Sequence, residues 1–261
     1  MKVAVRVGSL LVLCLALLPA LALAAPPEPK GKLVYQDDFS DKTKSKLEDN
    51  LKATDYSRGF HAPGVYHLIM RQPNETHWVL FPDQSYSNFS VQIDVADASD
   101  DFSGSVSAGM VFRAQDNSHL YAVLLDARQQ KYAVRKLNGQ QWSDLIAFKP
   151  SSLIQARDGH NQLRIDGDGD TFTIYLNGET LDSFKDASYK QGGIGMIQSN
   201  IDAVGPHHHW DNVTIYTTDT PTTNTPSTLP TTGQAGEGAP LAVAAFAFAL
   251  LVLGLWVRQR R

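Results

Sequence analysis

The sequence predicts an all-β fold, a sandwich or barrel of short strands, and two kinds of observation support this. Residues 89–96 read FSVQIDVA, so apolar residues alternate with polar or small ones at the period of a half-buried strand. Asn138-Gly139 and Asn177-Gly178 lie between strand-like segments and have the chemistry of two-residue hairpin turns. Many short strands joined by tight turns are typical of a sandwich or barrel.

Ten segments carry strand-like patterns. In chain order they are 33–39, 65–70, 89–96, 108–114, 120–126, 131–137, 162–166, 171–176, 194–198 and 210–216. Gly167-Asp168-Gly169 marks a further tight turn before the segment at 171–176. Only residues 41–52 are spaced in a way that permits a short helix. We therefore expect one folded domain over residues 32–216, long enough for one well-buried core.

The N-terminus predicts export. Lys2 and Arg6 precede an apolar stretch, and small residues follow before Pro26, which is the order of a secretory signal peptide over residues 1–25. The only cysteine, Cys14, lies inside this segment, so the exported protein has neither a disulfide nor a thiol-based site. A lipoprotein anchor at Cys14 is the alternative, but Leu13 is bulky where such signals have a small residue.

The C-terminus predicts a membrane anchor. Residues 239–257 are apolar over nearly the length that a helix needs to cross a bilayer. The basic tail at 258–261, RQRR, is expected to stay in the cytoplasm, which leaves the rest of the chain outside. Taken alone, this pattern indicates a single-pass membrane protein with its C-terminus inside.

The pentapeptide LPTTG at 229–233 precedes this span and changes its interpretation. The order of pentapeptide, spacer, apolar span and basic tail resembles the LPXTG cell-wall sorting signal of monoderm bacteria. The resemblance implies that sortase cleaves the Thr232–Gly233 bond and passes the Thr232 acyl group to an amine on a cell-wall precursor or another protein. Leu229 and Pro230 would be the recognition pair and Thr231 the variable position. Pro230 biases Leu229 toward an extended shape that an enzyme groove can grip.

The segment that would be displayed, residues 25–232, has 18 lysines and arginines against 26 aspartates and glutamates. This acidic balance argues against nucleic acid and anionic lipid as partners, because both need a basic face. Residues 217–228 contain mainly Thr, Pro, Ser, Asn and Asp, with no large apolar residue to bury before Leu229. They are expected to form an extended, solvated linker.

Several runs along the domain resemble the concanavalin A-like lectin/glucanase superfamily, and within it the laminin-G-like jelly rolls that include 3-keto-disaccharide hydrolase-like domains. They are YQDDFSD (35–41), AGMVFRAQDNSHLYAVLLDAR (108–128), NQLRIDGDGDTFTIYLNGETL (161–181), GGIGM (192–196) and WDNVTIY (210–216). The resemblance implies two stacked antiparallel sheets, one of them curved so that its concave side holds glycan. This superfamily hosts lectins, glycosidases and adhesion modules, so the resemblance predicts fold better than activity.

Glycan sites combine aromatic faces, which stack on sugar rings, with side chains that bond the hydroxyls. The glycan-binding candidates on or beside the central strand pair are Arg113, His119, Tyr121, Arg135 and Trp142. The alternative is that Tyr121 and Trp142 are packing residues and that Arg113 is a paired structural charge.

Glycoside hydrolysis needs two opposed carboxylates. Glucanases of the resembled superfamily carry them as Glu-x-Asp-x-x-Glu on one strand, and this sequence has no such motif. We therefore expect no catalysis of the glucanase kind. A site built from loop carboxylates such as Asp116, Asp126 or Asp144 stays open as an alternative.

Three features suggest metal sites. The resemblance implies a structural calcium ion near the first and last strands, where Asp38 and Asp211 are candidate ligands. The run Asp166–Asp170 resembles the opening of a calcium loop, but it lacks the glutamate at the twelfth position and is better explained as a hairpin turn. His207–His209 could bind a transition metal through two imidazoles, but adjacent histidines on an extended chain point opposite ways. Pro206 favours a solvated loop here, which is the expectation we keep.

Together these observations predict an extracellular, cell-wall-anchored, non-catalytic module that binds glycan or a neighbouring surface. A sugar hydrolase and a purely structural surface protein are the alternatives. Two carboxylates facing each other in the groove would favour the hydrolase, and a groove filled by side chains would favour the structural role.

Overall fold

The computed structural model of the chain describes residues 26–50, 56–61, 64–82, 85–99, 104–157, 159–219 and 232–236. The predicted signal peptide, most of the predicted linker, Leu229 to Thr231 and the predicted membrane span lie outside these residues. Within the described part of the chain, no helix is long and apolar enough to cross a membrane.

The described residues form antiparallel strands in two sheets, and no helix occurs among them. The strands are β1 (Lys32–Asp37), β2 (Tyr56–His61), β3 (Val65–Met70), β4 (Glu75–Leu80), β5 (Phe89–Asp97), β6 (Ser105–Asp116), β7 (His119–Asp126), β8 (Lys131–Asn138), β9 (Gln141–Pro150), β10 (Asn161–Asp168), β11 (Thr171–Leu176), β12 (Glu179–Lys185), β13 (Gly193–Ile201), β14 (His207–Thr217) and β15 (Thr232–Gly236).

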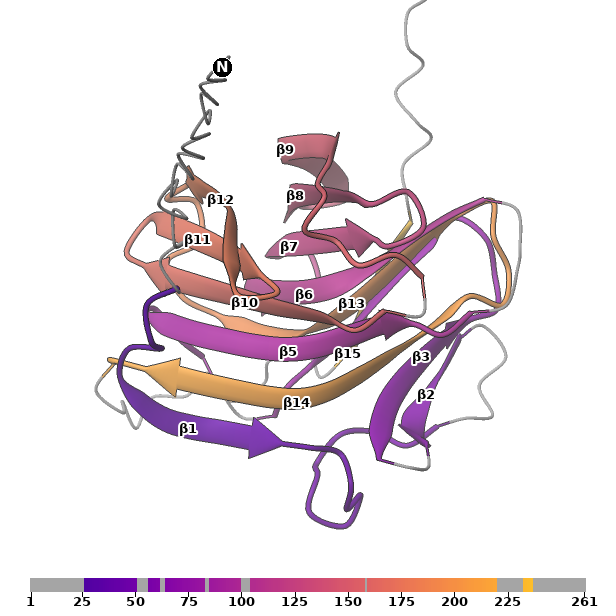
Figure 1. Cartoon of the computed structure of the whole chain (residues 1–261), viewed down its shortest axis with the longest axis horizontal. Coiled ribbons are helices and arrows are strands. Elements are labelled where there is room, and N and C mark those ends of the chain that lie inside the picture. The colour runs from indigo at the N-terminus through magenta and orange to yellow at the C-terminus, as the bar shows by residue number, and fades with distance from the viewer. Residues whose placement is uncertain are drawn as a thin grey trace, which may run out of the picture.

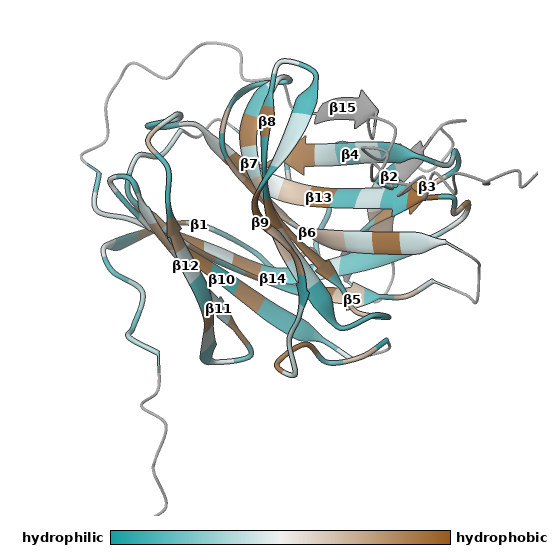
Figure 2. Cartoon of the chain, turned by 90° about the horizontal axis from the view of Figure 1, so that it is seen from above, coloured by the Kyte–Doolittle hydropathy of each residue, from teal (hydrophilic) through white to brown (hydrophobic). Residues whose placement is uncertain are grey.

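The eight-stranded sheet has the order β12-β11-β10-β5-β14-β3-β2, and β1 also pairs with β14. The seven-stranded sheet has the order β15-β4-β13-β6-β7-β8-β9. Figure 1 looks onto the eight-stranded sheet, with β14 and β5 across its middle and the other sheet behind it. Seen from above, the two sheets are separate layers, which confirms the predicted two-sheet fold (Figure 2).

The main core lies between the sheets, where each strand turns every second side chain inward. Val91 and Ile93 of β5 meet Met110 and Phe112 of β6 in this layer, and all four are fully buried. Strand β13 packs closely enough on β4 to need a glycine at position 195, because a Cβ there would lie 2.1 Å from the carbonyl oxygen of Val79.

The predicted hairpin turns form as expected. Asn177 and Gly178 both have positive φ, 52° and 82°, between β11 and β12. Positive φ at both central residues is the requirement of a type I′ turn, which matches the twist of the flanking strands. Between β8 and β9 only the first central residue, Gly139, has positive φ, 67°, which is the pattern of a type II′ turn.

All ten predicted strand segments lie on strands, but β2, β4, β9, β12 and β15 were not predicted. Strand β4 (ETHWVL) is buried on both faces and therefore lacks alternation, while β9 has irregular register with β8. No helix forms at residues 41–50. The Asp41 carboxylate instead accepts hydrogen bonds from the backbone and hydroxyl of Thr43, a local turn that competes with helix formation.

Candidate functional site

The outer face of each sheet is the face turned away from the other sheet, and the outer face of the seven-stranded sheet is apolar over half its extent. Strand alternation sends Val79 into the main core and Trp78 and Leu80 outward. The outward residues form a second buried cluster, with Trp142 packed against its edge. Its members are Trp78, Leu80, Val111, Ala114, Leu120, Ala122, Leu124, Leu137 and Ile197.

The other half of this face is polar. The Thr76 hydroxyl donates to the Ser199 hydroxyl at 2.9 Å across β4 and β13. A small cavity of about 30 Å³ lies beside them, lined in part by Ser107, Arg135 and Phe148. The face is therefore graded, from a filled apolar half to a half whose buried side chains carry hydroxyl groups.

Arg135 and Trp142 meet at the edge of this face. Both point outward, since Leu137, two residues from Arg135 on β8, pairs with Trp142 and belongs to the outer cluster. The Arg135 guanidinium lies 5.1 Å from the Trp142 ring centroid and donates to Asp144 at 3.0 Å. Phe148, 43% exposed, adds a second aromatic side chain. We name these four side chains the Arg135–Trp142 cluster.

The cluster combines the groups that sugars require. Aromatic faces pack on the CH-rich side of a pyranose, and a guanidinium held by a carboxylate can still donate its remaining N–H groups to hydroxyls. Both Arg135 and Trp142 were glycan-binding candidates, and the structure brings them together. Phe148 was not among them, because the irregular register of β9 hides which face it takes.

Arg113 lies in a different environment, between the sheets. Its φ of 52° and a register shift after Phe112 form a β-bulge that turns its side chain into the core, where it is 1% exposed. It donates to the carbonyl oxygens of Tyr189 and Gly169, both at 2.8 Å, and to that of Ser87. Burial lowers the pKa of its guanidinium. These contacts give Arg113 a structural role in joining three segments.

Tyr121 is also fully buried between the sheets. Its hydroxyl donates to the Asp186 carboxylate at 2.5 Å and accepts from the backbone N–H of Tyr189 at 3.1 Å. Burial, together with the hydrogen bond to Asp186, raises the pKa of this phenol. His119, at the start of β7, is more accessible and contacts the Asp116 carboxylate at 2.9 Å. The five glycan-binding candidates therefore do not form one site.

The carboxylates on the outer face of the seven-stranded sheet are already engaged. Asp126 is 2% exposed and accepts from the Ser105 hydroxyl and from the backbone N–H groups of Arg128 and Gln129. Asp144 is paired with Arg135. Within the described strands of this face, no further Asp or Glu points outward near the Arg135–Trp142 cluster, so the opposed acids that glycoside hydrolysis needs do not occur there.

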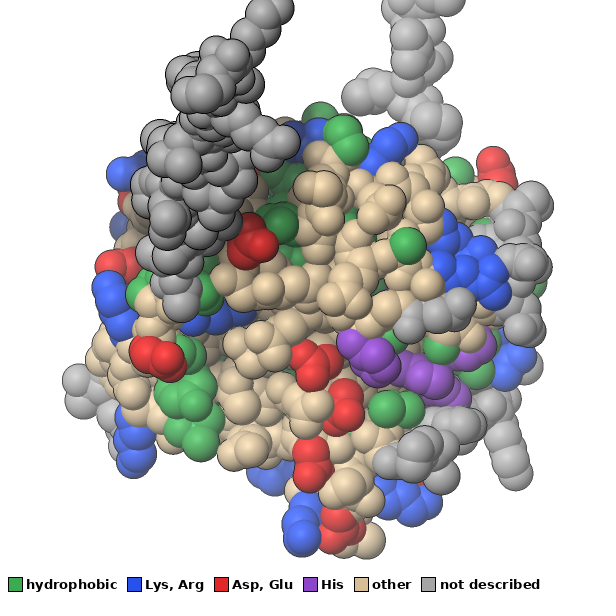
Figure 3. Space-filling view, viewed as in Figure 1, with side chains coloured by type: hydrophobic (Ala, Val, Ile, Leu, Met, Phe, Trp, Pro, Cys, Tyr) green, Lys and Arg blue, Asp and Glu red, His purple; other side chains and the backbone are tan. Residues whose placement is uncertain are grey.

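The outer face of the eight-stranded sheet is polar instead. Figure 3 shows acidic side chains near its middle with histidine side chains beside them. Asp94 and Asp211 lie opposite each other on β5 and β14. Burial raises the pKa of Asp211, and the neighbouring carboxylates Asp94 and Asp38 raise it further, while a hydrogen bond from the backbone N–H of Asn212 lowers it. The assignment of Asp38 and Asp211 as calcium ligands stays a prediction.

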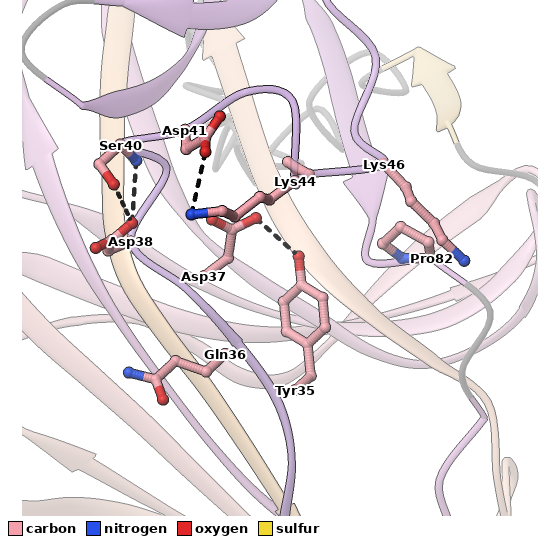
Figure 4. A pocket seen from close by; sticks show the side chains of 10 residues that line it. Tyr35, Gln36, Asp37, Asp38, Ser40, Asp41, Lys44, Lys46 and Pro82 are labelled. Carbon is pink, nitrogen blue, oxygen red and sulfur yellow. Dashed lines mark hydrogen bonds and ion pairs between the residues drawn. The ribbon is translucent and has the colours of Figure 1, made fainter.

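An open cavity of about 490 Å³ lies where β1 ends, lined by Asp37, Asp38, Asp41 and Lys44 among others (Figure 4). The Asp38 carboxylate accepts from the hydroxyl and backbone N–H of Ser40, which lower its pKa. The Asp41 carboxylate pairs with Lys44 at 3.1 Å. Because these carboxylates serve local turns, they do not converge. No group of three or more His, Cys, Asp and Glu side chains within the described ranges stands in metal-binding geometry.

No protein-family model matches this sequence, and no curated protein matches it as a relative. Solved structures do match its fold. A carbohydrate-binding module, CBM66, from Bacillus subtilis aligns with TM-score 0.50 and 19% identity over 64% of this chain and 98% of its own. What these structures share with this chain is the fold, a jelly roll of two antiparallel sheets. A Bacillus licheniformis β-glucanase aligns with TM-score 0.51 and 12% identity over 72% and 99%. A Bacillus subtilis protein of unknown function with a galectin-like fold gives 0.53 and 12% over 72% and 98%.

The sorting motif is only partly within the described residues. Thr232 and Gly233 open β15, and their backbones pair with Val79 and Trp78 of β4. Leu229, Pro230 and Thr231 lie outside them. This pairing could not be predicted from the sequence, because Thr232–Gly236 (TGQAG) has no strand pattern.

Proposed function

We propose that this chain is a non-catalytic carbohydrate-binding module and that the Arg135–Trp142 cluster is where it holds glycan. The observation that carries the proposal is the pairing of Arg135 with Trp142 on the outer face of the seven-stranded sheet, beside hydroxyl groups. Structures of the same fold include a protein described as a carbohydrate-binding module, which is consistent with this use of the fold.

The fold also hosts a β-glucanase, which makes hydrolysis the second function to weigh. The engaged state of Asp126 and Asp144 disfavours it, because a general acid and a nucleophile or base must both reach the sugar. A structural role is supported by one observation, the filled apolar half of the same outer face. The test must therefore separate glycan binding from packing.

The test is glycan-array binding by the full-length chain in detergent, with calcium and with a chelator. Trp142→Ala should weaken binding about fivefold to thirtyfold, since a stacked aromatic ring contributes on the order of 1 to 2 kcal/mol. Arg135→Lys keeps the charge but loses the planar fork, so it should weaken binding less than Arg135→Ala. Leu33→Ala, which removes another exposed apolar side chain, is the matched control and should bind like the wild type.

Silence on every glycan, or binding that Trp142→Ala and Arg135→Ala leave unchanged, would remove the proposal. Binding accompanied by cleavage of the glycan would favour the hydrolase instead. Melting temperatures of the variants separate lost binding from lost fold, since Trp142 also packs against the outer apolar cluster.

We further propose that the module works outside the cell, attached to the wall through Thr232. The order of signal peptide, LPTTG, apolar span and basic tail supports this, and its partners would be sortase and an acceptor amine. Since β15 pairs with β4 through Thr232 and Gly233, this segment must leave the sheet edge before an enzyme can bind it. Mass spectrometry of protein from native cells should find a C-terminus at Thr232 linked to the acceptor. An intact hydrophobic tail would contradict the proposal.

A further inference from the structure

Three histidines that the sequence predicted to lie in a loop, His207 to His209, belong to a strand. Strand β14 begins at His207, directly after Pro206, so the loop expectation for 207–209 is wrong. The alternation of the strand turns His208 inward, where it is buried beside Trp210. His207 and His209 consequently share the outer face of the eight-stranded sheet, and both are half-buried.

Strand β3 brings a third imidazole to the same place. His67 is the direct cross-strand partner of His209, and a long stretch of chain separates them in sequence. Its ring centroid lies 5.8 Å from that of His209 and 6.3 Å from that of His207. The centroids of His207 and His209 are 5.4 Å apart. These three side chains form a compact triangle, the three-histidine patch.

The triangle is close to the size that a metal ion requires. With metal–nitrogen distances near 2 Å and tetrahedral angles, the centroids of three coordinating imidazoles lie about 5 Å apart. The rings as they stand are slightly farther apart, and the described residues contain no group in metal-binding geometry. Closure needs the ring centroids to approach by up to about 1.3 Å, which rotation of the half-buried His207 and His209 rings can supply.

The surrounding charge favours a cation. Asp211 follows His209 by two residues on the same face, and Asp94 lies opposite Asp211 on β5. Figure 3 shows histidine and acidic side chains side by side on this face. Such a field raises the local concentration of divalent cations.

We propose that His67, His207 and His209 together bind one divalent transition-metal ion through their imidazole nitrogens. Imidazole is a preferred ligand of Zn²⁺, Ni²⁺ and Cu²⁺, whereas Ca²⁺ and Mg²⁺ prefer oxygen. Water completes the coordination sphere. The rings exchange their present contacts for the metal, and two adjacent β-strands hold them in place as the ion binds. The site is independent of the Arg135–Trp142 cluster, which lies on the other sheet.

The test is a Zn²⁺ titration of the chelator-stripped, full-length protein by calorimetry, with the imidazole resonances followed by NMR. We expect one ion per chain, with shifts confined to the three rings and their neighbours. His209→Gln and His207→Gln should each weaken binding at least about tenfold, and His67→Gln should act in the same direction. His119→Gln, a half-exposed histidine on the other sheet, is the matched control and should bind like the wild type.

Binding should be lost near pH 5, because protons compete for the imidazole nitrogens, and excess Ca²⁺ should not displace Zn²⁺. No binding up to millimolar Zn²⁺ would overturn the proposal. So would binding that His207→Gln and His209→Gln leave unchanged, since the ion would then lie elsewhere. His207 is half-buried and has no place in the main core, so its variant keeps the test valid if His67→Gln folds poorly.

Discussion

The outer faces of the two sheets differ in composition although the same strand alternation builds both. The seven-stranded sheet places a layer of buried apolar side chains on its outer face, with Trp78 on β4 at one end of the layer and Trp142 on β9 at the other. The eight-stranded sheet places Asp94, Asp211 and His209 there. The difference is visible in the strands. Strand β7 (HLYAVLLD) is buried on both faces, while β5 (FSVQIDVAD) alternates. An uninterrupted apolar strand therefore indicates that its second face is also covered.

The largest effect on stability is expected on the apolar outer face. Trp78→Ala removes a fully buried indole from the outer cluster and should lower the free energy of unfolding by about 3 to 5 kcal/mol. Asp94→Asn, at the middle of the other outer face, should change it by no more than about 0.5 kcal/mol. Urea denaturation monitored by circular dichroism measures both.

If Trp78→Ala costs less than about 1 kcal/mol, the outer cluster is not a second core. The outer faces of the two sheets would then be equivalent surfaces. A large cost for Asp94→Asn would show instead that the polar face has a structural role.

A second prediction concerns Arg113, which sits between the sheets and not on either outer face. Arg113→Met keeps much of the apolar stem but leaves the carbonyl oxygens of Tyr189, Gly169 and Ser87 without this donor. Each buried acceptor left unsatisfied costs about 1 kcal/mol or more, so we expect a loss of about 3 kcal/mol in unfolding free energy. Glycan binding by the folded fraction should stay at the wild-type level. A stable variant that no longer binds glycan would place Arg113 in the binding site.

The sequence allowed the two-sheet fold and most strands to be predicted, because alternation and Asn-Gly turns are local signals. It also identified Arg135 and Trp142, which the structure brings together across β8 and β9. The sequence did not show that Arg113 lies in a different environment from Arg135 and Trp142. The positive φ at Arg113 shifts the alternation by one residue, and nothing in a short run such as VFRAQ announces a β-bulge.

The three-histidine patch could not be predicted from the sequence either. Alternation along β14 follows from sequence once the strand is known, but His67 joins it only through the register of β3 against β14. Register is set by the hydrophobic pattern of the whole sheet, so a single strand does not reveal its partner. The edge position of β15 is unpredictable for the same reason.

The smallest effect concerns the contact that joins the sheets at one edge, just after β12. The Asp186 carboxylate accepts hydrogen bonds from the Tyr121 hydroxyl, the Lys136 ammonium and the Ser188 backbone N–H, with its Oδ2 2.9 Å from the Lys136 Nζ. Burial alone would raise the pKa of Asp186, but hydrogen bonds from Ser188, Tyr121 and Lys136 outweigh it and hold the pKa well below the ordinary value. Asp186→Asn should therefore cost about 1 kcal/mol at pH 7.

The sign of the pH dependence follows from that shift. A carboxyl group whose pKa is lower in the folded state contributes stability above its ordinary pKa, near 4, and loses it as the pH falls toward the folded value. The difference in unfolding free energy between the wild type and Asp186→Asn should thus be constant from pH 7 to about 5 and shrink below about pH 4. Urea titrations across this range measure it. A difference that grows on acidification would mean that Asp186 is protonated in the folded protein, and the two sheets would then be joined by neutral hydrogen bonds alone.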